Sequence, residues 1–182
     1  LPSIEPLLSD RIDHLIEHDV VTHSADRKNP HGFQFDVPEY KYNLGEIYNL
    51  CISRGTLTEE ERFKINDHIV QTIVMLEALP FPKHLERVPE IAGGHHEKMD
   101  GTGYPKKLRG EDMSIPARVM AIADVFEALT AADRPYKSPK KLSESIKIMS
   151  SMVEGKHLDP ELFKLFLESG VYRDYAHKYL LP

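Results

Sequence analysis

HHEKMDGTGYP, residues 95–105, is the stretch of this 182-residue chain that decides its fold. Two adjacent imidazoles are followed at once by carboxylates, and two glycines then precede a tyrosine and a proline. Neutral imidazole is the commonest metal ligand in proteins, and glycine allows positive φ or a close backbone approach. We therefore interpret the stretch as a metal site followed by a ligand-binding loop. The alternative is a surface loop at a helix C-terminus, where His and Gly are ordinary.

At these residues the chain resembles the HD-GYP subgroup of the HD-domain metal-dependent phosphohydrolases, whose signature is HHExxDGxGYP. A second block resembles the family's next segment in the same order. It comprises Ala117-Arg118, Ala123-Asp124, Glu127-Ala128-Leu129-Thr130 and Asp133-Arg134-Pro135-Tyr136-Lys137, with one extra residue between Asp124 and Arg134. The resemblance covers about Arg54 to Leu167 and implies an HD-domain-like helical bundle.

The resemblance also implies a role for individual residues. His68, His95, His96 and Asp124 would be metal ligands, Gly103, Tyr104 and Pro105 would form the substrate loop, and Arg134 and Lys137 would hold phosphate by charge-assisted hydrogen bonds. The resemblance alone favours a ligand at His68, because a lone histidine on a helix is more often a packing residue. Asp124 is the one charge in the apolar stretch 119–126, so it should meet a cation or a metal.

Glu97 and Asp100 follow the histidine pair closely, and we assign them to the catalytic group as residues that orient the imidazoles. Their spacing is equally compatible with solvated charges at a helix end.

Ligation by His and Asp without a thiolate suits Fe, Mn, Zn or Ni. The resemblance implies two or three divalent metal ions, with Fe or Mn favoured, that activate water for in-line hydrolysis of a phosphodiester. It also implies the substrate, cyclic di-GMP, which is opened to the linear dinucleotide and sometimes cleaved on to GMP. Another cyclic dinucleotide or phosphoester remains an alternative substrate.

A non-catalytic signalling module is the alternative from another class. It would bind cyclic di-GMP or a diguanylate cyclase domain through the Tyr104 loop, and it is motivated by the missing upstream His-Asp and Gly-Lys element of the family. The pair His18-Asp19 continues differently, as Val20-Val21-Thr22-His23, so we interpret it as solvated, as we do His14, His23 and His31. We therefore expect hydrolysis in the intact parent, whereas this 182-residue portion alone should retain little metal and no measurable activity. Apolar surface exposed by the missing element should favour self-association.

The chain reads as two segments. Residues 1–42 form an irregular accessory segment or insertion, with a helical stripe at Leu8, Ile12, Leu15 and Ile16 and a short strand at 32–37. Residues 43–182 are predicted to be all-α, a bundle of about five or six helices. The predicted helices span 44–53, 58–79, 88–96, a run from Pro116, 143–154, 160–169 and 171–180. Asn43 opens the first helix, a capping box opens the second, and Ser143 caps the one at 143–154. The buried stripe predicted for helix 58–79 consists of Ile65, Ile69, Val70, Ile73 and Leu76.

Charge and composition limit the classes of partner. A net charge of -6 argues against a nucleic-acid polymer, yet residues 97–141 carry nine Lys/Arg against seven Asp/Glu. The single cysteine, Cys51, excludes an internal disulfide, and its apolar neighbours predict a buried thiol in a reducing cytoplasm. No apolar run approaches the roughly 20 residues of a membrane span, and no signal peptide is visible.

Overall fold

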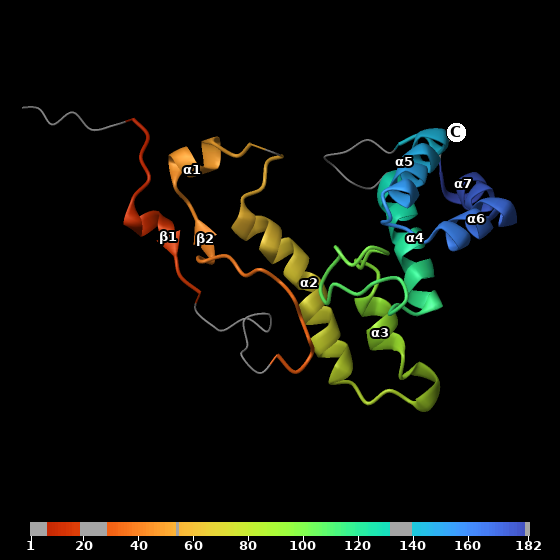
Figure 1. Cartoon of the computed structure of the whole chain (residues 1–182). Helices are drawn as coiled ribbons and strands as arrows, with labels where there is room; N and C mark the ends of the chain where they lie inside the picture. The colour runs from red at the N-terminus through yellow and green to blue at the C-terminus, as the bar shows by residue number, and fades with distance from the viewer. Residues whose placement is uncertain (1–6, 19–28, 54, 132–139, 181–182) are drawn as a thin grey trace, which may run out of the picture. The chain divides into compact units, whose positions relative to one another are not determined.

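A computed structural model describes residues 7–18, 29–53, 55–131 and 140–180 of the chain (Figure 1). Seven α-helices and one short pair of strands make up the regular structure of these residues, together with short 3-10 turns. The prediction of an all-α fold is therefore confirmed. None of the described helices is long and apolar enough to cross a membrane. The chain divides into two compact units, residues 1–71 and 72–182, and the division falls inside helix α2.

The first unit begins with short elements. The 3-10 turn η1, Ile12–His14, leads into β1, Leu15–Ile16, which pairs antiparallel with β2, Tyr42–Asn43. Helix α1 then spans Glu46–Leu50. It begins later than predicted, because the Asn43 side chain accepts a hydrogen bond from Gly45 N in a turn.

Two predictions for the first 42 residues are wrong. The helical stripe at residues 8–16 forms only the η1 turn, and residues 32–37 form no strand. The Asn29 side chain accepts from Phe33 N at 2.8 Å and donates to Phe33 O at 2.7 Å. Because these two backbone groups are bound by a side chain, they cannot join a strand ladder.

The predicted buried thiol is also wrong, since Cys51 is exposed at the C-terminal end of α1. The apolar neighbour Leu50 is itself 70% exposed, because α1 has only five residues and offers no wide apolar face.

Helix α2, Glu59–Glu77, has the start that its sequence predicts. Thr58 N donates to the Glu61 carboxylate at 3.0 Å, and Glu61 N donates to the Thr58 hydroxyl at 3.2 Å, so the capping box is confirmed. The buried stripe is narrower than predicted. Ile69 and Ile73 are buried, whereas Ile65 is 53% exposed.

The second unit holds the remaining helices, which Figure 1 shows in green to blue. They are the 3-10 turn η3, Lys83–Leu85, and helices α3, Val88–Gly93; α4, Ile115–Thr130; α5, Leu142–Glu154; α6, Pro160–Ser169; and α7, Val171–Tyr179. Helix α4 is central, because it packs on α3, α5 and α6, while α7 packs on α6. The buried core cluster consists of Ala121, Ile122, Phe126, Met149, Leu158 and Phe163.

Local signals set most helix ends in this unit. Ser114 caps α4 by accepting from Ala117 N, and Asp159 caps α6 by accepting from Glu161 N and Leu162 N. Helix α6 ends at Gly170, whose φ of +71° is easily adopted only by glycine. Ser143 is not the cap of α5, because that helix already begins at Leu142.

Helix α3 ends at Gly93 instead of at the predicted His96, because the chain turns there to begin the signature loop. The two glycines at this end allow close packing. A Cβ at Gly93 would lie 2.7 Å from Ile73 Cγ1, and a Cβ at Gly94 would lie 3.0 Å from the Cβ of Ala117. The histidine pair therefore directly follows the point at which α3 packs closely against α2 and α4.

The cap of α6 supplies a stability prediction. Asp159 Oδ2 also accepts from Arg118 Nη1 at 2.6 Å, and the Asp159 side chain is only 5% exposed. We expect Asp159→Ala to lower the free energy of unfolding by about 2–4 kcal/mol, since it removes a cap and strands a partly buried charge. Asp159→Asn keeps the capping oxygen and should cost less. Urea denaturation of both variants checks this, and equal losses would contradict the capping role.

Candidate metal centre

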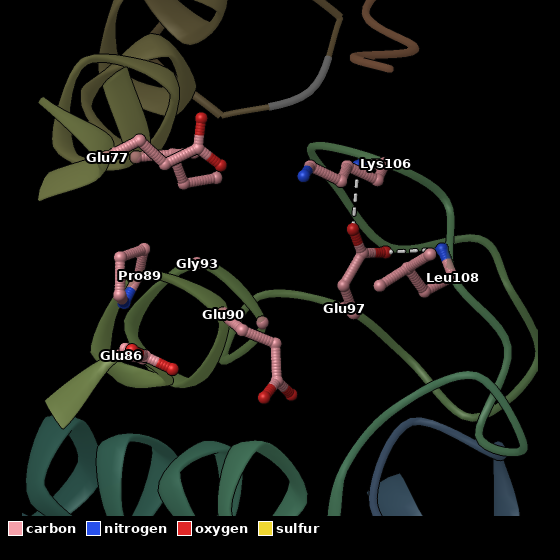
Figure 2. A pocket seen from close by; sticks show the side chains of 10 residues that line it. Glu77, Glu86, Pro89, Glu90, Gly93, Glu97, Lys106 and Leu108 are labelled. Atoms are coloured by element: carbon pink, nitrogen blue, oxygen red, sulfur yellow. Dashed lines mark hydrogen bonds between the residues drawn. The ribbon is translucent and has the colours of Figure 1, made fainter. Parts of the chain in front are cut away.

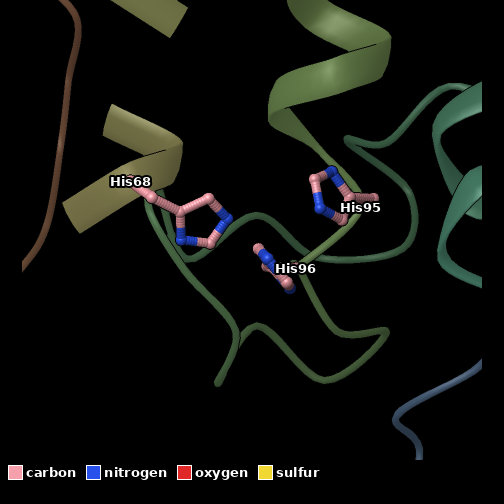
Figure 3. Close-up of side chains that lie close together, drawn as sticks. All are labelled: His68, His95 and His96. Carbon is pink, nitrogen blue, oxygen red and sulfur yellow. The ribbon is translucent and has the colours of Figure 1, made fainter. Parts of the chain in front are cut away.

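Three histidines come together at the start of the signature loop. His68 lies on α2, whereas His95 and His96 follow the end of α3. One ligand atom from each of the three rings lies within 4.8 Å of the others. Figure 3 shows the three side chains close together. The structure thus assembles three of the four residues that the family resemblance names as metal ligands.

Hydrogen bonds determine which ring nitrogen is protonated in two of these histidines. His68 Nδ1 lies 2.5 Å from Ile65 O, and His95 Nδ1 lies 2.6 Å from Ala92 O. A carbonyl oxygen only accepts, so we assign the proton to Nδ1 and the lone pair to Nε2 in both rings. This is the tautomer in which a ligating imidazole is oriented by its other nitrogen. The donor set therefore fits a divalent metal.

Tyr104 is attached to the same group. Its ring stacks on His96 with 4.8 Å between the ring centroids, and its backbone N–H donates to His96 O at 3.2 Å. Burial, and next the negative charge of Asp124, raise the pKa of Tyr104. The phenol therefore stays protonated at neutral pH and lies beside the histidines.

Asp124, the fourth proposed ligand, lies half-buried in the middle of α4. Its charge acts on Tyr104, but it does not belong to the three-histidine group found among the described residues. The structure therefore places Asp124 next to the Tyr104 loop, and its metal role stays a prediction.

Glu97 is 1% exposed, so it is not a solvated helix-end charge. Its Oε1 accepts from Lys106 N at 2.6 Å, and its Oε2 accepts from Leu108 N at 2.9 Å (Figure 2). Burial raises the pKa of Glu97, and the two backbone donors act in the opposite direction. Both of these hydrogen bonds run to the loop backbone.

The carboxylate of Glu97 also borders a cavity of about 250 Å³ (Figure 2). Lys106 and Leu108 stand on the same side as Glu97. The remaining lining residues are Ile73, Glu77, Glu86, Pro89, Glu90, Gly93 and Gly94.

The loop from Asp100 to Pro105 is closed by its own residues. Asp100 Oδ1 accepts from Thr102 N at 2.9 Å and from Thr102 Oγ1 at 2.7 Å, and these bonds lower the pKa of Asp100. A Cβ at Gly103 would lie 2.4 Å from Lys98 N and 2.5 Å from Glu97 Cα, so only glycine fits there. Pro105 is fully buried and follows a cis peptide bond.

His157 is a neighbour of the loop that the sequence did not single out. Its carbonyl accepts from Met99 N at 3.4 Å. Burial, and next the positive charge of Lys98, lower the pKa of His157. No motif marks this residue, because its contact with the loop depends on how the α5–α6 connection packs.

The remaining sequence predictions concern two phosphate-binding residues and the histidines of the first 42 residues. Arg134 and Lys137 lie outside the described residues, as do Asp19 and His23. His18 Nε2 lies 3.0 Å from Pro38 O, and His31 stacks on Phe33. Within the described part of the chain, neither His18 nor His31 belongs to a group of metal-ligand atoms.

Comparisons with known proteins agree with the signature. A family model for the HD domain matches residues 2–162, a range that includes most of segment 1–42. The proposed domain boundary after residue 42 stays a prediction.

Three curated relatives illustrate the similarity. The chain is 39% identical over 132 residues to 3'3'-cGAMP-specific phosphodiesterase 1 of Vibrio cholerae, covering 71% of this chain and 30% of the relative. It is 35% identical over 148 residues to a cyclic di-GMP phosphodiesterase of Thermotoga maritima, covering 77% and 39%. It is 43% identical over 122 residues to the cyclic di-GMP phosphodiesterase response regulator RpfG of Xanthomonas campestris, covering 65% and 32%. The chain thus spans roughly a third of the length of these relatives.

Proposed function

Because the chain belongs to the HD-domain family and carries its HD-GYP signature, we propose that it is the catalytic domain of a metal-dependent phosphodiesterase acting on a cyclic dinucleotide. One observation carries the proposal: three imidazoles converge beside a loop that presents Tyr104. The names of the relatives support the substrate class, since they include enzymes for cyclic di-GMP and for 3'3'-cGAMP.

His68, His95 and His96 would hold the metal, with Asp124 as a further ligand. We propose two or three divalent ions, with Fe or Mn favoured over Zn or Ni for this His and Asp donor set. Bound divalent ions supply Lewis acidity at a phosphoryl oxygen and lower the pKa of water. The carbonyls of Ile65 and Ala92 keep two imidazoles oriented with Nε2 outward through their Nδ1 bonds.

The loop residues would bind and orient the substrate. The raised pKa of Tyr104 keeps its phenol neutral, so its hydroxyl can donate a hydrogen bond to a phosphate oxygen. Gly103 and Pro105 set the backbone on either side of this ring. Arg134 and Lys137 are proposed to add charge-assisted bonds to phosphate.

A metal-removal experiment tests this function. The intact parent protein, once purified, should contain bound divalent metal and should hydrolyse cyclic di-GMP, 3'3'-cGAMP or both, whereas the 182-residue portion alone is expected to do neither measurably. Because the metal supplies the Lewis acid, turnover should disappear with a chelator and return when Mn²⁺ or Fe²⁺ is added. Elemental analysis and chromatography of the products measure both effects. Little bound metal together with tight dinucleotide binding and no turnover would support the non-catalytic signalling module instead.

A further inference from the structure

Glu97 is the buried carboxylate that joins the two functional parts of the signature. It follows His96 directly in the chain, and its oxygens accept from the backbone N–H groups of Lys106 and Leu108. These two donors lie just beyond Pro105. One side chain therefore connects the histidine pair to the far end of the loop that carries Tyr104.

The loop backbone leaves little room for another arrangement. Tyr104 N donates to His96 O, and a Cβ added at Gly103 would lie only 2.4 Å from Lys98 N and 2.5 Å from Glu97 Cα. The Glu97 carboxylate closes the same loop from its other end. Backbone N–H groups bound to a buried carboxylate make strong charge-assisted bonds, so their loss should release the loop.

The geometry argues against two other roles for this residue. A group that moves protons at the reacting atoms must reach them, yet each Glu97 oxygen is held at 2.6 Å or 2.9 Å by a backbone amide. A residue that orients an imidazole would bind its ring nitrogen. For His95 that place is taken by Ala92 O, which lies 2.6 Å from Nδ1.

We propose that Glu97 is a positioning residue. By holding the backbone at 106–108, it sets the position of the Tyr104 ring relative to the three histidines. This inference rests on the proposed function for its effect on catalysis. Its structural part concerns the loop alone. Glu97 therefore determines how well the substrate is held and leaves the metal content unchanged.

Glu97→Gln is the direct test, because the variant keeps the side-chain volume but turns one acceptor into an NH₂ donor that faces an N–H group. We expect backbone amide exchange at 106–108 to accelerate about 10- to 100-fold. In the intact parent protein with the same substitution, the KM for the cyclic dinucleotide should rise about 10- to 100-fold, with metal content unchanged. The pKa values that limit kcat/KM should also stay where they are.

Two further variants serve as controls. Glu111→Gln makes the same chemical change at an exposed position of the following segment, and it should alter neither exchange nor KM. Glu97→Asp keeps two acceptors on a shorter side chain, so it should restore part of the protection. Backbone amide exchange in α5, a helix outside the loop, reports on global folding in every variant.

Three outcomes would overturn the inference. The first is unchanged exchange at 106–108 in Glu97→Gln. The second is a fall in kcat with loss of one limb of the pH profile, which would make Glu97 an acid or base. The third is loss of bound metal, which would indicate that Glu97 orients the metal-binding imidazoles. If the intact parent protein without any substitution hydrolyses no cyclic dinucleotide, the proposed function fails, and the exchange result still decides whether Glu97 holds the loop.

Discussion

In the intact parent protein, His95→Ala is expected to remove bound metal and to reduce hydrolysis of a cyclic dinucleotide by about 100-fold or more. The substitution deletes one of three histidine ligand atoms that lie within 4.8 Å of one another. Loss of one of the four proposed ligands weakens metal binding, and the metal is what would activate water in the proposed reaction. Elemental analysis and turnover, measured on one preparation, check both parts.

A matched control uses a histidine of the same unit outside the cluster. His84 is exposed in the short turn η3, so His84→Ala should leave metal and turnover as they are. Normal metal content and turnover in His95→Ala would contradict the three-histidine site. Loss of metal in both variants would point to general instability of the second unit instead.

Gly103→Ala should have the largest effect of any single methyl group added to the loop. The new Cβ would meet backbone atoms of Glu97 and Lys98 at 2.4 to 2.6 Å, and backbone cannot move aside as a flexible side chain can. We expect the free energy of unfolding to fall by about 3 kcal/mol or the loop to rearrange with a loss of turnover of at least about 10-fold. Thermal denaturation and kinetics distinguish the two responses.

Gly155→Ala provides the comparison for that variant. Its Cβ would lie 3.4 Å from Ser151 O and 3.7 Å from Met152 O, and its φ of -76° suits any residue. This variant should change the free energy of unfolding by less than about 1 kcal/mol. If both alanine variants behave alike, the close approach at Gly103 is not what requires glycine.

The helices of the second unit could be predicted because their signals are local. Ser114, Asp159 and Gly170 act within a few residues of the helix ends that they set. In the first unit, the capping box of Thr58 and Glu61 is a local signal of this kind for α2, but the start of α1 depends on a distant residue. Helix α1 is capped by Asp10, whose carboxylate accepts from Tyr48 N across 38 positions, and a bond of that reach leaves no pattern in the sequence.

The site could be predicted only in part. The family resemblance named His68. The structure adds the reason why this histidine suits a metal, since Ile65 O, one turn earlier on α2, orients its ring. Spacing alone left Glu97 open between an orienting residue and a solvated charge. Burial decides against the solvated charge, and its hydrogen-bond donors come from residues 106 and 108, which no short motif would connect to it. Self-association and contact with a diguanylate cyclase domain stay predictions.

The self-closed loop has a consequence for protein design. Its shape is maintained by bonds from Glu97 to the backbone at 106–108, from Tyr104 N to His96 O and from Gly110 N to Met99 O. All of these partners lie between residues 96 and 110, whereas the bond from Met99 N to His157 O reaches beyond that span. Most of the hydrogen bonds that maintain the shape of this segment therefore form within the segment itself. It is therefore a candidate for grafting onto the end of another helix, provided that the acceptor scaffold offers one carbonyl in place of His157.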